Sequence, residues 1–139
     1  MVTVVVDTNL FIAGRFNTQS SSNKILDWVV EGTVSAVYSP QIKDENLFIL
    51  QKVNPPRDFV DKIFKYYNCP HNTLVRPKKR TSACQDKSDN RYLEAAVEGG
   101  ADYVISNDHH LLDIGEYCGV KILRPGEFTR KIQRKVVVE

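Results

Sequence analysis

Residues 2–9 read VTVVVDTN, a run of β-branched residues that ends in one acidic and two small polar residues. Val2–Val6 are apolar on both faces, which is typical of a strand buried inside a parallel sheet. Val34–Tyr38 indicates a second strand of this kind. These stretches predict an α/β protein whose central strands are covered by helices.

Helical and strand patterns alternate along the rest of the chain. Helices are expected at about 21–30, 40–53, 59–67, 88–98 and 108–114 and from 125 onward, with further strands at 73–75, 103–106 and 120–123. The alternation predicts a three-layer α/β/α fold around a mostly parallel sheet of four to five strands. We expect one domain over residues 1–128, followed by a basic C-terminal tail over 129–139.

The composition excludes several classes of protein. With 139 residues, of which 42% are hydrophobic and 26% charged, the chain suits one packed domain rather than a disordered or fibrous protein. A membrane-spanning helix needs about 20 apolar residues, far more than any run here, and we expect no membrane association. Cys69, Cys84 and Cys118 fit no zinc or disulfide spacing. Without an export signal, they indicate reduced thiols in a cytoplasmic protein.

Two aspartates follow predicted strands. Asp7 comes directly after the first strand, and Asp108 comes two residues after the strand that ends at Ser106. In open α/β sheets, ligands gather outside the carboxyl ends of the strands. We therefore expect both carboxylates at the same edge of the sheet, although either one alone could serve only as a turn residue or a helix N-cap.

Two further acids border apolar helix faces. Asp89 precedes Tyr92 and Leu93 by three and four residues, so it begins the inward face of its helix. Glu45 lies between Ile42 and Ile49 on another helix. Alone, Asp89 could simply complement a helix dipole and Glu45 could be a surface acid.

Together, Asp7, Glu45, Asp89 and Asp108 predict a cation site. Converging carboxylates repel each other by roughly 4 kcal/mol per close pair at an effective dielectric of about 20. All-oxygen sites of this kind favour Mg²⁺ or Mn²⁺. Asp86 is interpreted as an N-cap or a supporting partner of the site. The adjacent pair His109 and His110 diverges on a helix and is not expected to bind one metal.

A basic loop accompanies these acids. Arg76, Lys78, Lys79 and Arg80 form a cluster that can contact phosphate groups. The alternative is ordinary solvated loop charge.

Three ordered motifs resemble one family, the PIN domains. They are VVVDTN at 4–9, SDNRYLEAA at 88–96 and GGADYVISNDHHLL at 99–112, and VKILRPGEF at 120–128 resembles the end of the same family. The subgroup that looks nearest is that of toxin components of toxin–antitoxin systems, similar to VapC. The resemblance implies a PIN-like fold and an endoribonuclease that hydrolyses RNA phosphodiesters in line with Mg²⁺ or Mn²⁺. It also implies a cognate antitoxin partner and a homodimer.

The resemblance carries over to the same acids. It implies Asp7, Glu45, Asp89 and Asp108 as the catalytic and metal-binding residues, with Asn9 and Ser106 as supporting polar positions. Under this hypothesis the basic loop at 76–80 holds the RNA backbone. Three alternatives remain open: an RNA-processing nuclease that is not a toxin, a catalytically idle PIN-like module that binds RNA or protein, and a DNA nuclease. A receiver domain or an aspartate-based phosphatase fits poorly, because Asn9 stands where the phosphatase pattern needs a second acid.

Overall fold

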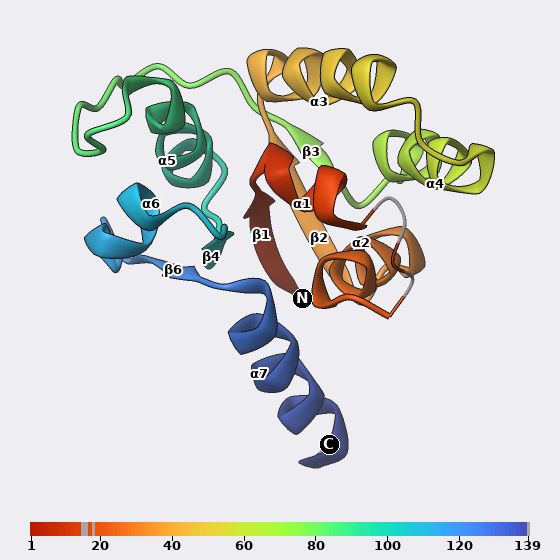
Figure 1. Cartoon of the computed structure of the whole chain (residues 1–139). Helices are drawn as coiled ribbons and strands as arrows, with labels where there is room; N and C mark the ends of the chain where they lie inside the picture. The colour runs from red at the N-terminus through yellow and green to blue at the C-terminus, as the bar shows by residue number, and fades with distance from the viewer. Residues whose placement is uncertain (15–16, 18, 139) are drawn as a thin grey trace.

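The computed structural model describes residues 1–14, 17 and 19–138, with side chains as far as residue 133. Within these residues, helices and strands alternate as predicted (Figure 1). The strands are β1 (Val2–Val6), β2 (Val34–Tyr38), β3 (Thr73–Leu74), β4 (Tyr103–Ile105), β5 (Glu116–Tyr117) and β6 (Val120–Leu123). The helices are α1 (Thr8–Gly14), α2 (Ser21–Glu31), α3 (Pro40–Val53), α4 (Arg57–Asn68), α5 (Asn90–Glu98), α6 (His109–Ile114) and α7 (Pro125–Val138), with a 3₁₀ turn, η1, at Lys87–Asp89.

The strands form one sheet in the order β3-β2-β1-β4-β6-β5. All neighbouring pairs are parallel except β5 and β6. The mostly parallel sheet was predicted, but the expectation of four to five strands was too low, because the structure has six among its described residues. The unpredicted β5 is only two residues long, and a tight turn with positive φ at Cys118 and Gly119 connects it to β6.

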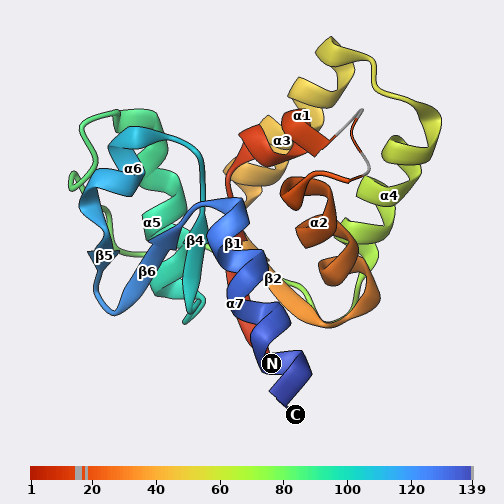
Figure 2. The same cartoon turned by 60° about the horizontal axis from the view of Figure 1, so that its bottom comes forward.

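Helices cover both faces of the sheet, which confirms the three-layer architecture (Figures 1 and 2). Side chains alternate between the faces along β1, so Val4 and Val6 enter one core and Val5 enters the other. The first core includes apolar residues of α1, α2, α4 and α7, and the second includes residues of α5 and α6. The central strands are therefore buried on both sides, as their composition indicates.

The first and the last helix of the chain differ from the expectations. The short helix α1 was not predicted, although it buries Leu10 and Phe11 directly after β1. Helix α7 is continuous through the expected boundary between residues 128 and 129, and it buries Phe128 and Ile132 on either side of it. The division into a domain and a tail stays a prediction. Among the described residues, no helix combines the length and the apolar character needed to cross a membrane.

Candidate active site

Three of the predicted acids gather at the point of the sheet where the strand order reverses. Strands β1 and β4 are parallel neighbours, with Val6 opposite Ile105. Strands β2 and β3 extend the sheet on one side of this pair, and β6 and β5 extend it on the other. The carboxyl ends of β1 and β4 therefore form a topological switch point, which is the usual place for a ligand in an open α/β sheet. Asp7 and Ser106 are the first residues beyond the two strands.

Asp7 is almost completely buried, with 3% of its surface exposed. The Ser106 hydroxyl donates a hydrogen bond to Asp7 Oδ2 over 2.6 Å, and the backbone N–H of Asn9 donates to Oδ1 over 3.1 Å. Burial raises the pKa of Asp7, the two hydrogen bonds lower it, and the charge of Asp108 raises it again. Two of the three predicted supporting residues therefore contact Asp7: Ser106 through its side chain and Asn9 through its backbone.

Asp108 is joined to Asp7 by the same serine. The backbone N–H of Asp108 donates to Ser106 Oγ over 2.9 Å, so the fully buried hydroxyl accepts from one aspartate and donates to the other. Asp108 also caps α6, because its Oδ1 accepts the His110 N–H over 2.8 Å. The N-cap role and a role in the site are thus compatible, since the second carboxylate oxygen takes no part in the cap.

Asp86 and Asp89 reach the site from the turn before α5. Asp86 caps η1 by accepting hydrogen bonds from the Ser88 backbone N–H and hydroxyl, which lower the pKa of Asp86. The Asp89 N–H donates to the Asp86 carbonyl over 3.0 Å, and this closed turn brings the two aspartates close together. Carboxylate oxygens of Asp86, Asp89 and Asp108 all lie within 4.8 Å of one another.

Asp89 contributes a buried carboxylate oxygen to this cluster. Its Oδ2 is buried and has no hydrogen-bond partner among the residues that the structure describes. Burial, contact with the Asp108 carboxyl and the charges of Asp7 and Asp86 raise the pKa of Asp89 to about 7. A buried carboxylate oxygen without a donor is costly. Three converging carboxylates with one orphaned oxygen fit a hard divalent cation such as Mg²⁺ or Mn²⁺.

Glu45 lies beside this cluster and is engaged in a different contact. From α3, its Oε2 accepts a hydrogen bond from Arg91 Nη1 over 2.7 Å. The Tyr92 hydroxyl lies 3.4 Å from the same oxygen. Of the four predicted acids, the structure thus brings Asp7, Asp89 and Asp108 together. Asp86 joins this cluster, and Glu45 lies next to it in an ion pair with Arg91. The assignment of Glu45 to the site stays a prediction.

A buried hydroxyl network behind Asp7 was not predicted. The Thr8 hydroxyl donates to Asn46 Oδ1 over 2.6 Å and lies 2.9 Å from the Tyr92 hydroxyl. Tyr92 was expected on the inward face of its helix, but a sequence pattern gives no partner for its hydroxyl group. These contacts join residues 38 and 84 positions apart, so only the folded chain reveals them. The network connects α1, α3 and α5 around the acids.

The predicted basic loop is attached to the same helix as Asp89. Arg76, Lys78, Lys79 and Arg80 are exposed. Glu94 of α5 accepts a hydrogen bond from the Thr81 N–H over 2.9 Å and pairs with Arg80 at 3.3 Å, and Glu98 accepts from the Lys78 N–H over 3.2 Å. Helix α5 therefore positions both the acidic turn at its start and the cationic loop along its side.

Comparison with known proteins agrees with this fold. A PIN domain model matches residues 3–110, so the chain belongs to the PIN domain family. An uncharacterized protein of Methanocaldococcus jannaschii is 27% identical over 146 residues, spanning 96% of this chain and 93% of that protein. A chain in the crystal structure of VapBC2 from Rickettsia felis, bound to a DNA fragment from their promoter, is 10% identical, with a TM-score of 0.51. That match covers 88% of this chain and 98% of the other, and it shows a shared fold.

Proposed function

We propose that this PIN domain is an Mg²⁺- or Mn²⁺-dependent endoribonuclease and the toxin of a toxin–antitoxin pair. The observation that carries the proposal is the convergence of Asp86, Asp89 and Asp108 carboxylates within 4.8 Å, with Asp7 close by and a buried Asp89 oxygen that lacks a donor among the described residues. PIN domains are generally metal-dependent nucleases. The fold, the donor set and the family therefore favour the same chemistry.

Each acid has a distinct place in the proposal. Asp89 and Asp108 would hold the cation with Asp7, and Asp86 supports them from the 3₁₀ turn. When bound, the cation would supply Lewis-acid stabilisation to a phosphodiester undergoing in-line attack by water. Ser106 fixes the orientation of the Asp7 carboxylate through its hydrogen bond. Glu45, held by Arg91, would help position the attacking water or a second ion.

RNA is proposed as the substrate from the family resemblance, and the cationic side chains that accompany the acids support binding of a nucleic-acid strand. Arg76, Lys78, Lys79 and Arg80 would bind backbone phosphates, whose negative charge repels a bare carboxylate cluster. The hydrogen bonds from the loop to Glu94 and Glu98 hold these cations beside α5. A strand bound by the loop would therefore lie along the helix that begins at the acidic turn.

An antitoxin protein and a second copy of the chain are the proposed partners. The Rickettsia felis structure with the similar fold is that of VapBC2 bound to a DNA fragment from their promoter. This likeness supports an antitoxin partner for this chain. We propose the cytoplasm as its location because Cys69, Cys84 and Cys118 are all free in the structure.

The test of this function is cleavage of single-stranded and structured RNA with Mn²⁺ or Mg²⁺, compared with EDTA. Asp108→Asn should lower cleavage about 100-fold or more, because it removes a charged oxygen donor from the cation site. Asp113→Asn is the matched control, because Asp113 is exposed on the same helix, α6. This variant should cleave RNA like the wild type. Cleavage that persists in EDTA, or equal rates for the wild type and Asp108→Asn, would contradict the proposal.

The toxin role has a separate test in growing cells. Induced expression of the wild-type chain in a bacterial host should arrest growth, because an unrestrained endoribonuclease depletes essential RNA. Expression of Asp108→Asn at the same level should permit growth. Growth arrest by both variants would refute an enzymatic toxin, and normal growth with an active purified enzyme would favour an RNA-processing role.

A further inference from the structure

A cavity of about 220 Å³ lies beside the acidic site, between the start of α3, the basic loop and α5. Its lining includes Ser39, Gln41, Arg76, Arg80, Arg91 and Glu94. Three arginines thus face one glutamate. That glutamate is already engaged by Arg80 and the Thr81 N–H. The cavity therefore has a net positive charge and a size suited to a small anion.

Arg91 connects this cavity to the acids. It follows Asp89 by two residues, its side chain is only 20% exposed, and its Nη1 pairs with Glu45. Its Nε donates to the Ser88 carbonyl over 2.6 Å. A guanidinium group has five N–H donors in a fixed plane, so two bonds to the protein orient the group and leave donors for a ligand. Arg91 is thus a preorganised phosphate contact rather than a flexible surface charge.

The start of α3 adds to the positive character of the cavity. Ser39 caps this 14-residue helix by accepting the Ile42 N–H, and the first turn contains no acidic residue. Pro40 at the start of the helix has no N–H and the Ile42 N–H is bonded to Ser39, so this end of α3 contributes mainly through the partial positive charge of the helix dipole. Together with Arg76 and Arg91, this end of α3 favours an anion with several acceptor oxygens.

We propose that this cavity binds a backbone phosphate of the RNA strand next to the bond that is cleaved, with Arg91 as the main contact. The proposal rests on the ribonuclease function and specifies where the strand lies, between the acids and the basic loop. Arg91 places the phosphate next to the turn that carries Asp89. Arg76 and Arg80 continue the contact along the loop.

The test is RNA binding without cleavage. Fluorescence anisotropy with a 5′-labelled single-stranded RNA in EDTA, measured at several salt concentrations, reports backbone contacts directly. Each phosphate contact to a single strand contributes about 0.7 to the slope of log K against log salt, which corresponds to about fivefold in affinity at about 0.1 M salt. Arg91→Gln should therefore weaken binding about fivefold and reduce the slope by about 0.7.

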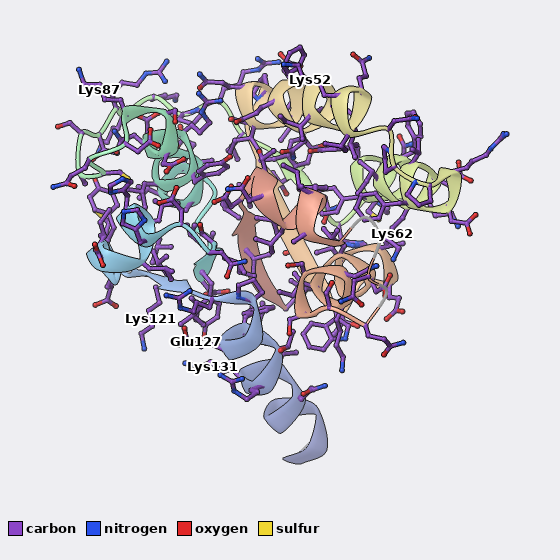
Figure 3. All side chains as sticks on the ribbon, viewed as in Figure 1. Lys52, Lys62, Lys87, Lys121, Glu127 and Lys131 are labelled. Carbon is purple, nitrogen blue, oxygen red and sulfur yellow. The ribbon has the colours of Figure 1, made fainter. Side chains whose placement is uncertain are left out.

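A control variant separates the local contact from a general loss of positive charge. Arg57→Gln changes net charge equally, but Arg57 is exposed at the start of α4. This helix also carries Lys62 and lies across the molecule from the loop with Lys87 (Figure 3). Arg57→Gln should bind like wild type.

The outcomes distinguish this site from the proposed function. Wild-type affinity for Arg91→Gln with an unchanged melting temperature would overturn the phosphate site, and so would an equal loss in Arg57→Gln. RNA binding that depends on Arg91, in a protein that does not cleave RNA with Mn²⁺, would support the phosphate site and refute the ribonuclease. Cleavage without any dependence of binding on Arg91 would do the reverse.

Discussion

Asp7→Asn should lower metal-dependent RNA cleavage about 1000-fold or more in kcat/KM, equivalent to ~4 kcal/mol of transition-state stabilisation. Asp7 is buried at the switch point, and its carboxylate is electrostatically coupled to Asp89 and Asp108. An amide of the same shape removes the charge that a cation needs. It keeps one of the two acceptor oxygens that Asn9 and Ser106 use, and it removes a charge that Asp89 and Asp108 repel. The expected loss is therefore one of catalysis with little loss of folding.

The measurement pairs cleavage rates with melting temperatures in EDTA. Asp58→Asn is a suitable control, because Asp58 is exposed on α4, away from the acids, and should keep full activity. Ser106→Ala should cost less than Asp7→Asn, about 10- to 100-fold, since it removes an orienting hydroxyl rather than a charge. If Asp7→Asn keeps more than a tenth of wild-type activity, Asp7 does not help to hold the cation.

The strand-end aspartates show how far the sequence could predict this site. Asp7 and Asp108 were expected at one edge because parallel strands present their carboxyl ends together. That rule needs neither the strand order nor the register. The structure adds that β1 and β4 are neighbours and that one serine hydroxyl joins the two acids. A side-chain bond between residues 99 positions apart leaves no periodic signal in the sequence.

Asp86 and Glu45 show why the rest of the site was harder to predict from the sequence. Asp86 was expected as a cap or a supporting residue, and it does cap η1. The 3₁₀ turn that follows Asp86 also brings its carboxylate within 4.8 Å of those of Asp89 and Asp108, and a helix expected from residue 88 contains no such turn. Glu45 was placed correctly on α3, but helix periodicity identifies a face and not a partner. Its partner, Arg91, is 46 residues away.

Short elements were missed for a related reason. Strand β5 contains only Glu116 and Tyr117, and its pairing depends on the neighbouring β6 rather than on its own composition. Helix α1 has seven residues, too few for a periodic apolar pattern to develop. The longer elements around the sheet agree with their patterns because burial on one or both faces constrains many residues at once.

Asp89→Asn should stabilise the metal-free protein while it removes cleavage activity. In the folded chain the pKa of Asp89 is raised from 3.8 to about 7, through burial and the nearby Asp108, Asp7 and Asp86. Between these two pH values the folded state holds a proton that the unfolded state has lost. The free energy of unfolding therefore falls as pH rises from about 4 to about 7, and the penalty is complete above pH 7.

The size of this effect is reduced by solvent, because Asp89 is not fully buried. We expect about 1–2 kcal/mol at pH 8 after allowance for screening, or about 5 °C in melting temperature. Asp89→Asn lacks this titration, so its melting temperature in EDTA should exceed that of the wild type at pH 8. The two proteins should converge near pH 4, where Asp89 is protonated in the folded wild type.

Added Mn²⁺ should reverse the order of stability. A cation that binds only the folded state stabilises it in proportion to the logarithm of its concentration above the dissociation constant. The wild type should therefore gain melting temperature with Mn²⁺ at pH 8, and Asp89→Asn should gain much less. Differential scanning calorimetry in low salt, with EDTA or Mn²⁺, measures both effects on the same proteins. A lower melting temperature for Asp89→Asn in EDTA at pH 8 would mean that the Asp89 carboxylate stabilises the fold. That result would contradict the prediction, because a partly buried charge that is repelled by its neighbours destabilises the folded state.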